Sequence, residues 1–193
     1  MSTEPAKDKI LRVSGDLILG KGFPATTVDE ICEAAKTSKG SFYHSFKSKE
    51  DLGLELLDQF WVNAKQVLGS GEFWQETDFK RRLEGFFQHL EASSEHLWGK
   101  GCLLGTFAMD MAETSPKTQR RVSDILSQMT SVMAPVFACL EESEQIDMTM
   151  EDAAVQFIAV IEGSILVARS HKDPSYIIRG IRNYRNLVMP LVA

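Results

Sequence analysis

Cysteine is scarce in this chain of 193 residues, which contains only Cys32, Cys102 and Cys139. An odd number of widely spaced cysteines does not make a disulfide framework, and it suits a reducing cytoplasm. The N-terminal segment, MSTEPAKDK, has no apolar core and therefore does not have the pattern of a secretory signal. From these two features we expect a cytoplasmic protein.

Long hydrophobic runs are also missing. The most apolar stretch, residues 153–168, is interrupted by Gln156, Glu162 and Ser164. Since a membrane helix needs about 20 consecutive apolar residues, this stretch is expected to be too short and too interrupted to span a bilayer. With 44% hydrophobic and 25% charged residues, the composition is that of an ordinary soluble globular protein.

Motifs of catalysis and of cofactor binding are absent as well. The chain has no H-E-x-x-H, C-x-x-C, G-x-S-x-G or phosphate-loop pattern, and its four histidines lack the spacing of metal ligands. The glycines at 99, 101 and 105 follow an expected helix and not a strand, so they do not form a dinucleotide fingerprint. The sequence therefore predicts no enzyme, no metal and no cofactor.

Strand patterning is missing too, because no stretch alternates apolar and polar residues over five or more positions. Helix start signals are frequent, with capping hydroxyls expected at Thr27, Ser48, Ser115 and Thr149. The sequence predicts an all-α fold of about nine helices. We expect them at residues 7–21, 28–35, 39–45, 49–68, 79–97, 103–113, 116–143 with a kink at Pro135, 150–170 and 174–188.

Charge is present but unevenly distributed. The net charge is −6, whereas residues 1–52 hold as many basic as acidic residues, so the remainder of the chain carries the whole excess. Four lysines and no acidic residue lie between Lys36 and Lys49. A local basic patch on an acidic body is a footprint of phosphate-backbone binding, although a lysine-rich stretch taken alone is more often a solvated surface.

Two short helices at 28–35 and 39–45, joined by a turn at 36–38, indicate a helix-turn-helix. The first has an apolar stripe formed by Val28, Ile31, Cys32 and Ala35. In such a unit the second helix enters the major groove with its N-terminal residues toward the base edges. The helix KGSFYHS suits this position, because Gly40 permits close approach while Ser38, Lys39 and Ser41 can donate hydrogen bonds.

Residues 7–55 resemble the DNA-binding domain of the TetR family of transcriptional regulators. Three motifs carry the resemblance at the right mutual spacing: G-F-x-A-T-T-V at 22–28, S-K-G-S-F-Y at 38–43 and F-x-S-K-E-D-L at 46–52. One departure is Lys36, which stands where the family usually has glycine. A left-handed backbone at this turn would cost a lysine about 1 kcal/mol.

The resemblance implies a role for each matching position. Thr27 and Lys49 would contact phosphates, although Thr27 acting only as a helix cap is the open alternative. Tyr43 and His44 would contact the DNA backbone. The residues implied to face the major groove are Thr37, Ser38, Lys39, Gly40 and Ser41.

The remainder of the chain is expected to be a second module, with domains at 1–48 for DNA binding and 49–193 for ligand binding and dimerisation. The resemblance implies an apolar cavity for a small-molecule effector. Candidate cavity residues are Trp61, Phe86, Phe107, Met111, Met129, Met133 and Phe137; for each of them, ordinary core packing is the alternative.

The two C-terminal helices are predicted to form a dimer interface, since the helix at 150–170 is apolar nearly all round and the helix at 174–188 has an apolar stripe. A twofold four-helix interface predicts a palindromic operator. The alternative is that both helices complete a monomer core. The interface residues expected are Phe157, Ile161, Ile165, Ile177, Ile181, Tyr184 and Val188.

Cys102 is a candidate sensing residue, because it follows Lys100 and Gly101 at an expected helix start. A helix N-terminus and a nearby lysine both favour the reactive thiolate. The segment is similar to the Gly-Cys-Leu stretch of some TetR-family members, a few of which respond to electrophiles or oxidants. The alternative is a small buried cysteine.

Taken together, the sequence predicts a cytoplasmic, homodimeric transcriptional regulator, most simply a repressor. Its expected partners are a palindromic double-stranded operator, a second copy of the chain and a small-molecule or thiol-reactive effector that releases it from DNA. The alternative is an all-helical ligand-binding bundle that does not bind DNA.

Overall fold

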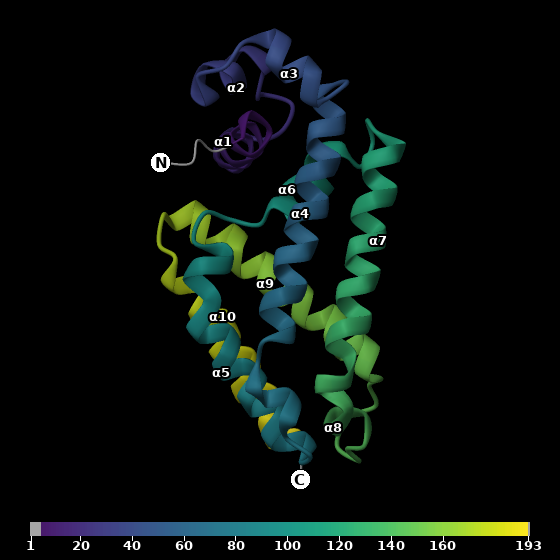
Figure 1. Ribbon diagram of the computed structural model, residues 1–193. Helices are drawn as coiled ribbons and strands as arrows, with labels where there is room; N and C mark the ends of the chain where they lie inside the picture. The colour runs from purple at the N-terminus through teal and green to yellow at the C-terminus, as the bar shows by residue number, and fades with distance from the viewer. Residues whose placement is uncertain (1–4, 193) are drawn as a thin grey trace. The chain divides into compact units, whose positions relative to one another are not determined.

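Helices and the turns that join them make up the described chain. The computed structural model describes residues 5–192, and none of these residues lies in a strand (Figure 1). The predicted all-α fold is therefore confirmed. The chain divides into two compact units, of which the first holds residues 5–62 and 102–124 and the second holds residues 63–101 and 125–192.

The first unit contains the three N-terminal helices together with α6. Its elements are α1 (Ala6–Lys21), α2 (Val28–Ala35), α3 (Lys39–Ser45), α6 (Leu103–Met111) and the first parts of α4 (Lys49–Gly69) and α7 (Pro116–Met133). Helix α1 packs against α2, α3 and α6. The core is apolar, with Ile10, Ile18, Ile31, Phe42 and Leu57 fully buried.

Helix α6 is tied into this unit by packing and by a hydrogen bond. The ring of Phe107 lies 4.9 Å from that of Phe23, centroid to centroid. Glycine at position 53 makes room for this pair, because a Cβ there would lie 2.9 Å from Phe107 Cε1. Asp110 Oδ2 accepts a hydrogen bond from the Phe23 N–H at 2.8 Å. The units are defined by packing, so the functional boundary at 48/49 stays a prediction.

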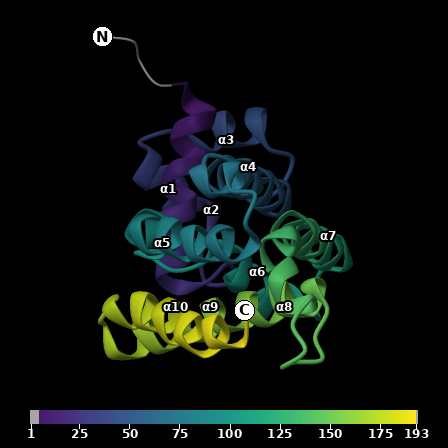
Figure 2. The same cartoon turned by 90° about the horizontal axis from the view of Figure 1, so that it is seen from below.

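The second unit is built around a layer of long helices. Its elements are the remainders of α4 and α7, η1 (Glu72–Gln75), α5 (Phe79–Trp98), η2 (Ala134–Phe137), α8 (Ala138–Glu141), α9 (Met150–His171), α10 (Ser175–Val188) and η3 (Met189–Leu191). Helix α10 packs against both α9 and α5, as both views show (Figures 1 and 2). The apolar stripes of these three helices meet between them.

Aromatic rings fill the interior of the second unit. Phe86 and Phe87 on α5 contact Phe137 of η2 and Phe157 of α9, with Phe86 lying 5.7 Å from Phe137 and 5.5 Å from Phe157 between ring centroids. Tyr184 of α10 completes the cluster 5.3 Å from Phe157. Burial raises the pKa of Tyr184 to about 12, because the charged phenolate is disfavoured away from water.

The predicted caps and the predicted kink are both present. In four helices the expected hydroxyl accepts a hydrogen bond from the backbone N–H three residues on: Thr27 from Glu30 at 3.3 Å, Ser48 from Asp51 at 3.0 Å, Ser115 from Thr118 at 3.1 Å and Thr149 from Asp152 at 3.0 Å. Pro135 interrupts the expected helix at 116–143, because proline has no N–H to donate, and the chain passes through η2 into α8.

Two helical stretches are long and apolar enough to cross a membrane by length and composition alone. They are Pro116–Glu141 with 26 residues and Met150–His171 with 22 residues. Helix α9 extends beyond residues 153–168 at both ends, and one or two helices of this kind are weak evidence for a membrane span. The core helices of globular proteins pass the same test, and α9 buries Phe157, Ile161 and Ile165 inside its unit.

Candidate functional site

A tight turn between α2 and α3 sets the geometry of the predicted helix-turn-helix. Lys36 ends α2 with φ 51° and ψ 49°, a left-handed conformation that it adopts although it is not glycine. Such a backbone costs a lysine about 1–2 kcal/mol. Ser38 then caps α3 by accepting a hydrogen bond from the Ser41 N–H at 3.1 Å. The turn is thus held on both sides by cap hydrogen bonds.

Helix α3 is anchored on one face and open on the other. Phe42 is fully buried, and its ring lies 5.5 Å from that of Phe46, which ends the helix. The side chain of Tyr43 is 55% exposed. The other exposed residues of this surface are Lys36, Ser38, Lys39, Gly40, His44 and Lys47, while Thr37 and Ser41 are half-buried. Every residue predicted to reach the major groove is therefore exposed or half-buried.

Asp29 of α2 forms an ion pair with a lysine of α3. Lys39 Nζ lies 2.6 Å from Asp29 Oδ1, and this hydrogen bond raises the pKa of Lys39. Both side chains are exposed, so water screens their attraction and a phosphate or a base edge can replace Asp29. Lys39 is consequently a positioned but exchangeable donor.

Thr27 forms a complete capping box with Glu30. The Thr27 N–H donates to Glu30 Oε2 at 2.9 Å, and the Glu30 N–H donates back to Thr27 Oγ1 at 3.3 Å. The Lys21 ammonium, together with Thr27, lowers the pKa of Glu30 to about 2. The stability that Glu30 contributes is present above its ordinary pKa and is lost as the pH falls toward 2. The cap role of Thr27 is therefore structural fact, and its phosphate contact stays a prediction.

Lys49 has a different environment from the one expected. Its Nζ lies 2.9 Å from the Phe23 carbonyl oxygen, 2.8 Å from that of Thr26 and 3.4 Å from that of Pro24. The ammonium also lies 4.5 Å from the centroid of the Phe23 ring, and burial lowers its pKa. Three carbonyls match the three donors of a lysine. These contacts show that Lys49 holds the loop that precedes α2, and its predicted phosphate contact stays a prediction.

The residues predicted for the dimer interface lie inside the second unit. Phe157, Ile161, Ile165, Ile177, Ile181, Tyr184 and Val188 are all buried within the single chain. This burial favours the alternative that they complete the core of a single chain, and their assignment as interface residues stays a prediction. Apolar side chains on the outer surfaces of α9 and α10 are instead Val155, Leu166, Val167 and Leu187. The sequence contained a signal for these residues on α9, because Val155 and Leu166 are about three helical turns apart and therefore lie on the same face of the helix.

The predicted effector residues are divided between the two units. Trp61, Cys102, Phe107 and Met111 belong to the first, and Phe86, Met129, Met133 and Phe137 belong to the second. Phe86 and Phe137 pack edge to face in the aromatic cluster, and Met133 is buried beside it. Met111 and Met129 are half-buried. Within each unit the buried members have the packing of core residues.

Cys102 begins α6, as predicted, but it is buried. Its side chain is 5% exposed, and Sγ accepts a hydrogen bond from the Gly105 N–H at 3.5 Å. Cys32 and Cys139 are buried as well, and burial raises the pKa of both thiols. Cys102 is the N-cap residue of α6, where the backbone donates to its sulfur.

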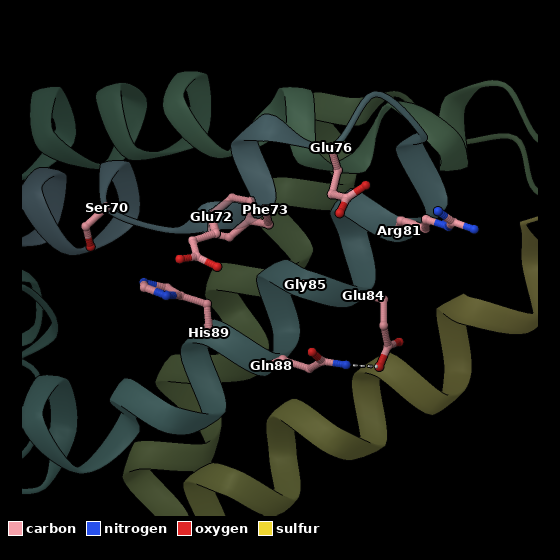
Figure 3. Close-up of a pocket in the computed structure, with 9 residues that line it drawn as sticks. All are labelled: Ser70, Glu72, Phe73, Glu76, Arg81, Glu84, Gly85, Gln88 and His89. Atoms are coloured by element: carbon pink, nitrogen blue, oxygen red, sulfur yellow. Dashed lines mark hydrogen bonds between the residues drawn. The ribbon is translucent and has the colours of Figure 1, made fainter.

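An open hollow of about 620 Å³ lies on the second unit between η1 and α5 (Figure 3). Its lining residues are Ser70, Glu72, Phe73, Glu76, Arg81, Glu84, Gly85, Gln88 and His89. Glu84 accepts a hydrogen bond from the Gln88 amide at 3.1 Å and lies 3.4 Å from Arg185. None of the predicted effector residues lines this hollow, and no group of three metal-ligating side chains occurs within residues 5–192.

Comparison with known proteins gives the same family for both parts of the chain. Residues 10–56 match the family described as "Bacterial regulatory proteins, tetR family", and residues 80–184 match "Tetracyclin repressor-like, C-terminal domain". The "HTH-type transcriptional repressor DhaR" of Mycobacterium sp. strain GP1 is 27% identical over 159 residues, which are 82% of this chain and 77% of that protein.

Solved structures agree in fold. A TetR-family transcriptional regulator from Agrobacterium tumefaciens superposes with a TM-score of 0.81 at 19% identity, covering 97% of this chain and 98% of the other. The reduced form of E. coli NemR superposes with a TM-score of 0.75 at 21% identity, with coverage of 97% and 98%. At these identities the likeness concerns the fold.

The contacts of Lys49 with the three loop carbonyls lead to a prediction about stability. Lys49→Ala removes the donor shared by three carbonyls, two of them in part-buried hydrogen bonds, and a hydrogen bond to a charged group contributes about 1.5–3 kcal/mol. We expect a lower urea midpoint for the full chain, measured by circular dichroism. Lys47→Ala is the matched control, because Lys47 is exposed and its loss should change stability by less than about 0.5 kcal/mol. Equal midpoints for the two variants would contradict the structural role.

Proposed function

Because this chain belongs to the TetR family of bacterial regulatory proteins, we propose that it is a cytoplasmic transcriptional repressor that binds a palindromic operator. The observation that carries this proposal is the outward surface of α3, which is anchored by Phe42 and presents donors to solvent. The name of the relative DhaR as a repressor supports repression over activation. This function needs no catalytic step and no cofactor.

On DNA, the N-terminal part of α3 enters the major groove. Lys39 exchanges its pairing with Asp29 for a base edge, and Tyr43 and His44 donate to phosphates, with Thr27 approaching a phosphate from the start of α2. The remaining groove-facing positions are Thr37, Ser38, Gly40 and Ser41. Base contacts specify sequence, whereas phosphate contacts set affinity and its dependence on salt.

Two substitutions on α3 separate these roles. Lys39→Ala should alter sequence preference, because an individual base contact is worth about 1–3 kcal/mol of discrimination. Tyr43→Phe removes only a hydroxyl and should weaken binding to all sequences alike. The measurement is fluorescence anisotropy with an operator selected from a random duplex library and with point variants of that operator. If the wild-type protein selects no duplex from the library, the alternative of a helical bundle that does not bind DNA holds. If Lys39→Ala keeps the sequence preference of the wild type, the proposed role of Lys39 is refuted.

The proposed assembly is a twofold dimer through the outer faces of α9 and α10. Four exposed large apolar side chains on these two helices support it, because exposed apolar surface is typical of interaction sites: Val155, Leu166, Val167 and Leu187. Dimers are common among oligomeric proteins, and a twofold axis matches a palindromic operator.

A pair of glutamate substitutions tests the assembly against core packing. Leu166 is 67% exposed, so Leu166→Glu should give folded monomer, because a carboxylate is costly only when an interface buries it. Ile181 is fully buried, so Ile181→Glu should lower the melting temperature or prevent folding. Sedimentation velocity and thermal melting distinguish the two. A wild type that sediments as a monomer at micromolar concentration would refute the dimer.

The proposed effector is a small molecule or a thiol-reactive compound. The position of Cys102 at the start of α6 supports a thiol sensor, since helix N-termini favour thiolate. Helix α6 contacts Phe23 of the same unit through Phe107 and Asp110. A group attached to Cys102 would therefore displace contacts within the unit that holds the helix-turn-helix. The burial of Cys102 implies that reagents reach it only when α6 opens locally.

Alkylation tests the proposal that the effector is a thiol-reactive compound. N-ethylmaleimide should release the wild type from its operator, whereas Cys102→Ser should bind DNA normally and ignore the reagent. Cys139→Ser is the control and should respond like the wild type. Peptide mass spectrometry would measure the rate at which each cysteine is modified. If Cys102 reacts no faster than Cys32 and Cys139, the effector is a reversible ligand.

A further inference from the structure

A second cavity of the second unit combines an apolar interior with a basic rim. Its volume is about 210 Å³, and it lies where the end of α5 meets the turn between α9 and α10. The lining residues are Trp98, Gly99, Lys100, Gly101, Ile165, Ala168, Arg169, Lys172, Asp173, Pro174 and Ile177. Pockets that enclose drug-sized ligands measure about 300–1,000 Å³, so this cavity suits a smaller molecule.

The inner surface of the cavity is apolar. Ile165, Ala168 and Ile177 are buried side chains of α9 and α10, and the half-buried indole of Trp98 adds an aromatic surface. Apolar surface of this kind binds the hydrocarbon part of a ligand through the hydrophobic effect. A free inorganic ion, which is strongly hydrated, gains nothing from it.

The rim carries cations in excess. Lys100, Arg169 and Lys172 are exposed, and Asp173 is the one acidic residue among the lining side chains. The Ser175 N–H donates to Asp173 Oδ1 at 2.9 Å, and this bond holds the pKa of Asp173 below its ordinary value. Asp173 is thus directed to the start of α10. The lining side chains thus comprise three cations and one carboxylate, which is hydrogen-bonded to the backbone. They give a positive rim on a chain whose net charge is −6.

The backbone of this turn is fixed in advance of binding. Lys172 adopts φ 53°, and the Asp173 N–H donates to the Ala168 carbonyl at 3.0 Å. The ring of His171 stacks on Tyr176 at 4.8 Å between centroids. A left-handed position is strained for lysine and unstrained for glycine. The charged side chain of Lys172 is therefore held at the rim by a rigid turn.

We propose that this cavity binds a small organic carboxylate, with an aromatic or branched aliphatic body against Trp98 and Ile165 and its carboxylate at Lys172 and Arg169. An apolar interior selects the body, and a basic rim selects the negative charge. The site does not depend on DNA binding by α3, and its readout is ligand binding itself. It is also separate from the predicted effector residues, none of which lines it.

Benzoate is the probe, with benzyl alcohol as the uncharged molecule of similar shape. We expect saturable benzoate binding to the full chain, by calorimetry and by a change in tryptophan fluorescence, with a Kd of about 0.1–1 mM. Benzyl alcohol should bind at least tenfold more weakly. Trp98→Phe should retain binding and lose the fluorescence change, since Trp61 and Trp74 do not line the cavity.

Two glycine substitutions supply a matched pair. Lys172→Gly removes a rim cation without straining the turn and should weaken benzoate binding at least fivefold. Lys36→Gly removes a lysine from the same backbone conformation in the other unit and should leave binding unchanged. Arg169→Gln provides a second rim variant with the same expected direction as Lys172→Gly. The proposal is overturned if benzoate does not saturate by about 10 mM, if benzyl alcohol binds as tightly, or if both rim variants keep wild-type affinity.

Discussion

The loop at residues 22–26 is the point on which the first unit depends. Helix α1 ends there and α2 begins just beyond it, while α4 and α6 each send one side chain to its backbone. Lys49 satisfies carbonyls of Phe23 and Thr26, and Asp110 accepts the N–H of Phe23. Buried backbone groups need such partners because leaving them unpaired is costly. The orientation of α2, and therefore of the turn that leads to α3, follows from this loop.

This arrangement gives α6 a mechanical role. Because Phe107 packs on Phe23 and Asp110 bonds to the same residue, α6 moves with the loop or breaks contacts with it. Glycine at 53 is required for that packing, since any larger residue would overlap the Phe107 ring. Close-packed contacts of this kind have discrete arrangements and do not deform smoothly. These contacts are the physical basis for the proposal that a change at the start of α6 alters the helix-turn-helix.

Local features of the structure could be predicted from the sequence, and contacts between distant residues could not. The caps at Thr27 and Thr149 depend on neighbours within a few residues, and both were expected. The left-handed backbone of Lys36 was not, because lysine replaces the glycine that usually adopts it. The role of Lys49 was missed because its acceptors lie more than 20 residues away. The motif gave its position beside the helix-turn-helix and gave no information on what its ammonium contacts.

The face of α9 shows a second limit of sequence reasoning. An apolar stripe shows that a face is covered, but it does not distinguish cover by the same chain from cover by a second copy. The stripe through Phe157, Ile161 and Ile165 is covered by α5 and α10, whereas Val155 and Leu166 remain outside. The exposed apolar residues of α9 are the ones on which the proposed dimer rests.

Charge distribution links these features to recognition. The acidic excess lies outside residues 1–52, so most of the chain repels a phosphate backbone while the turn and α3 present Lys36, Lys39 and Lys47. Repulsion over the rest of the surface disfavours non-specific binding in other orientations. Asp29 and Glu30 pair with Lys39 and Lys21 and so reduce the free positive charge of the interface itself. In the proposed complex, fewer free cations mean less counterion release and a weaker dependence of affinity on salt.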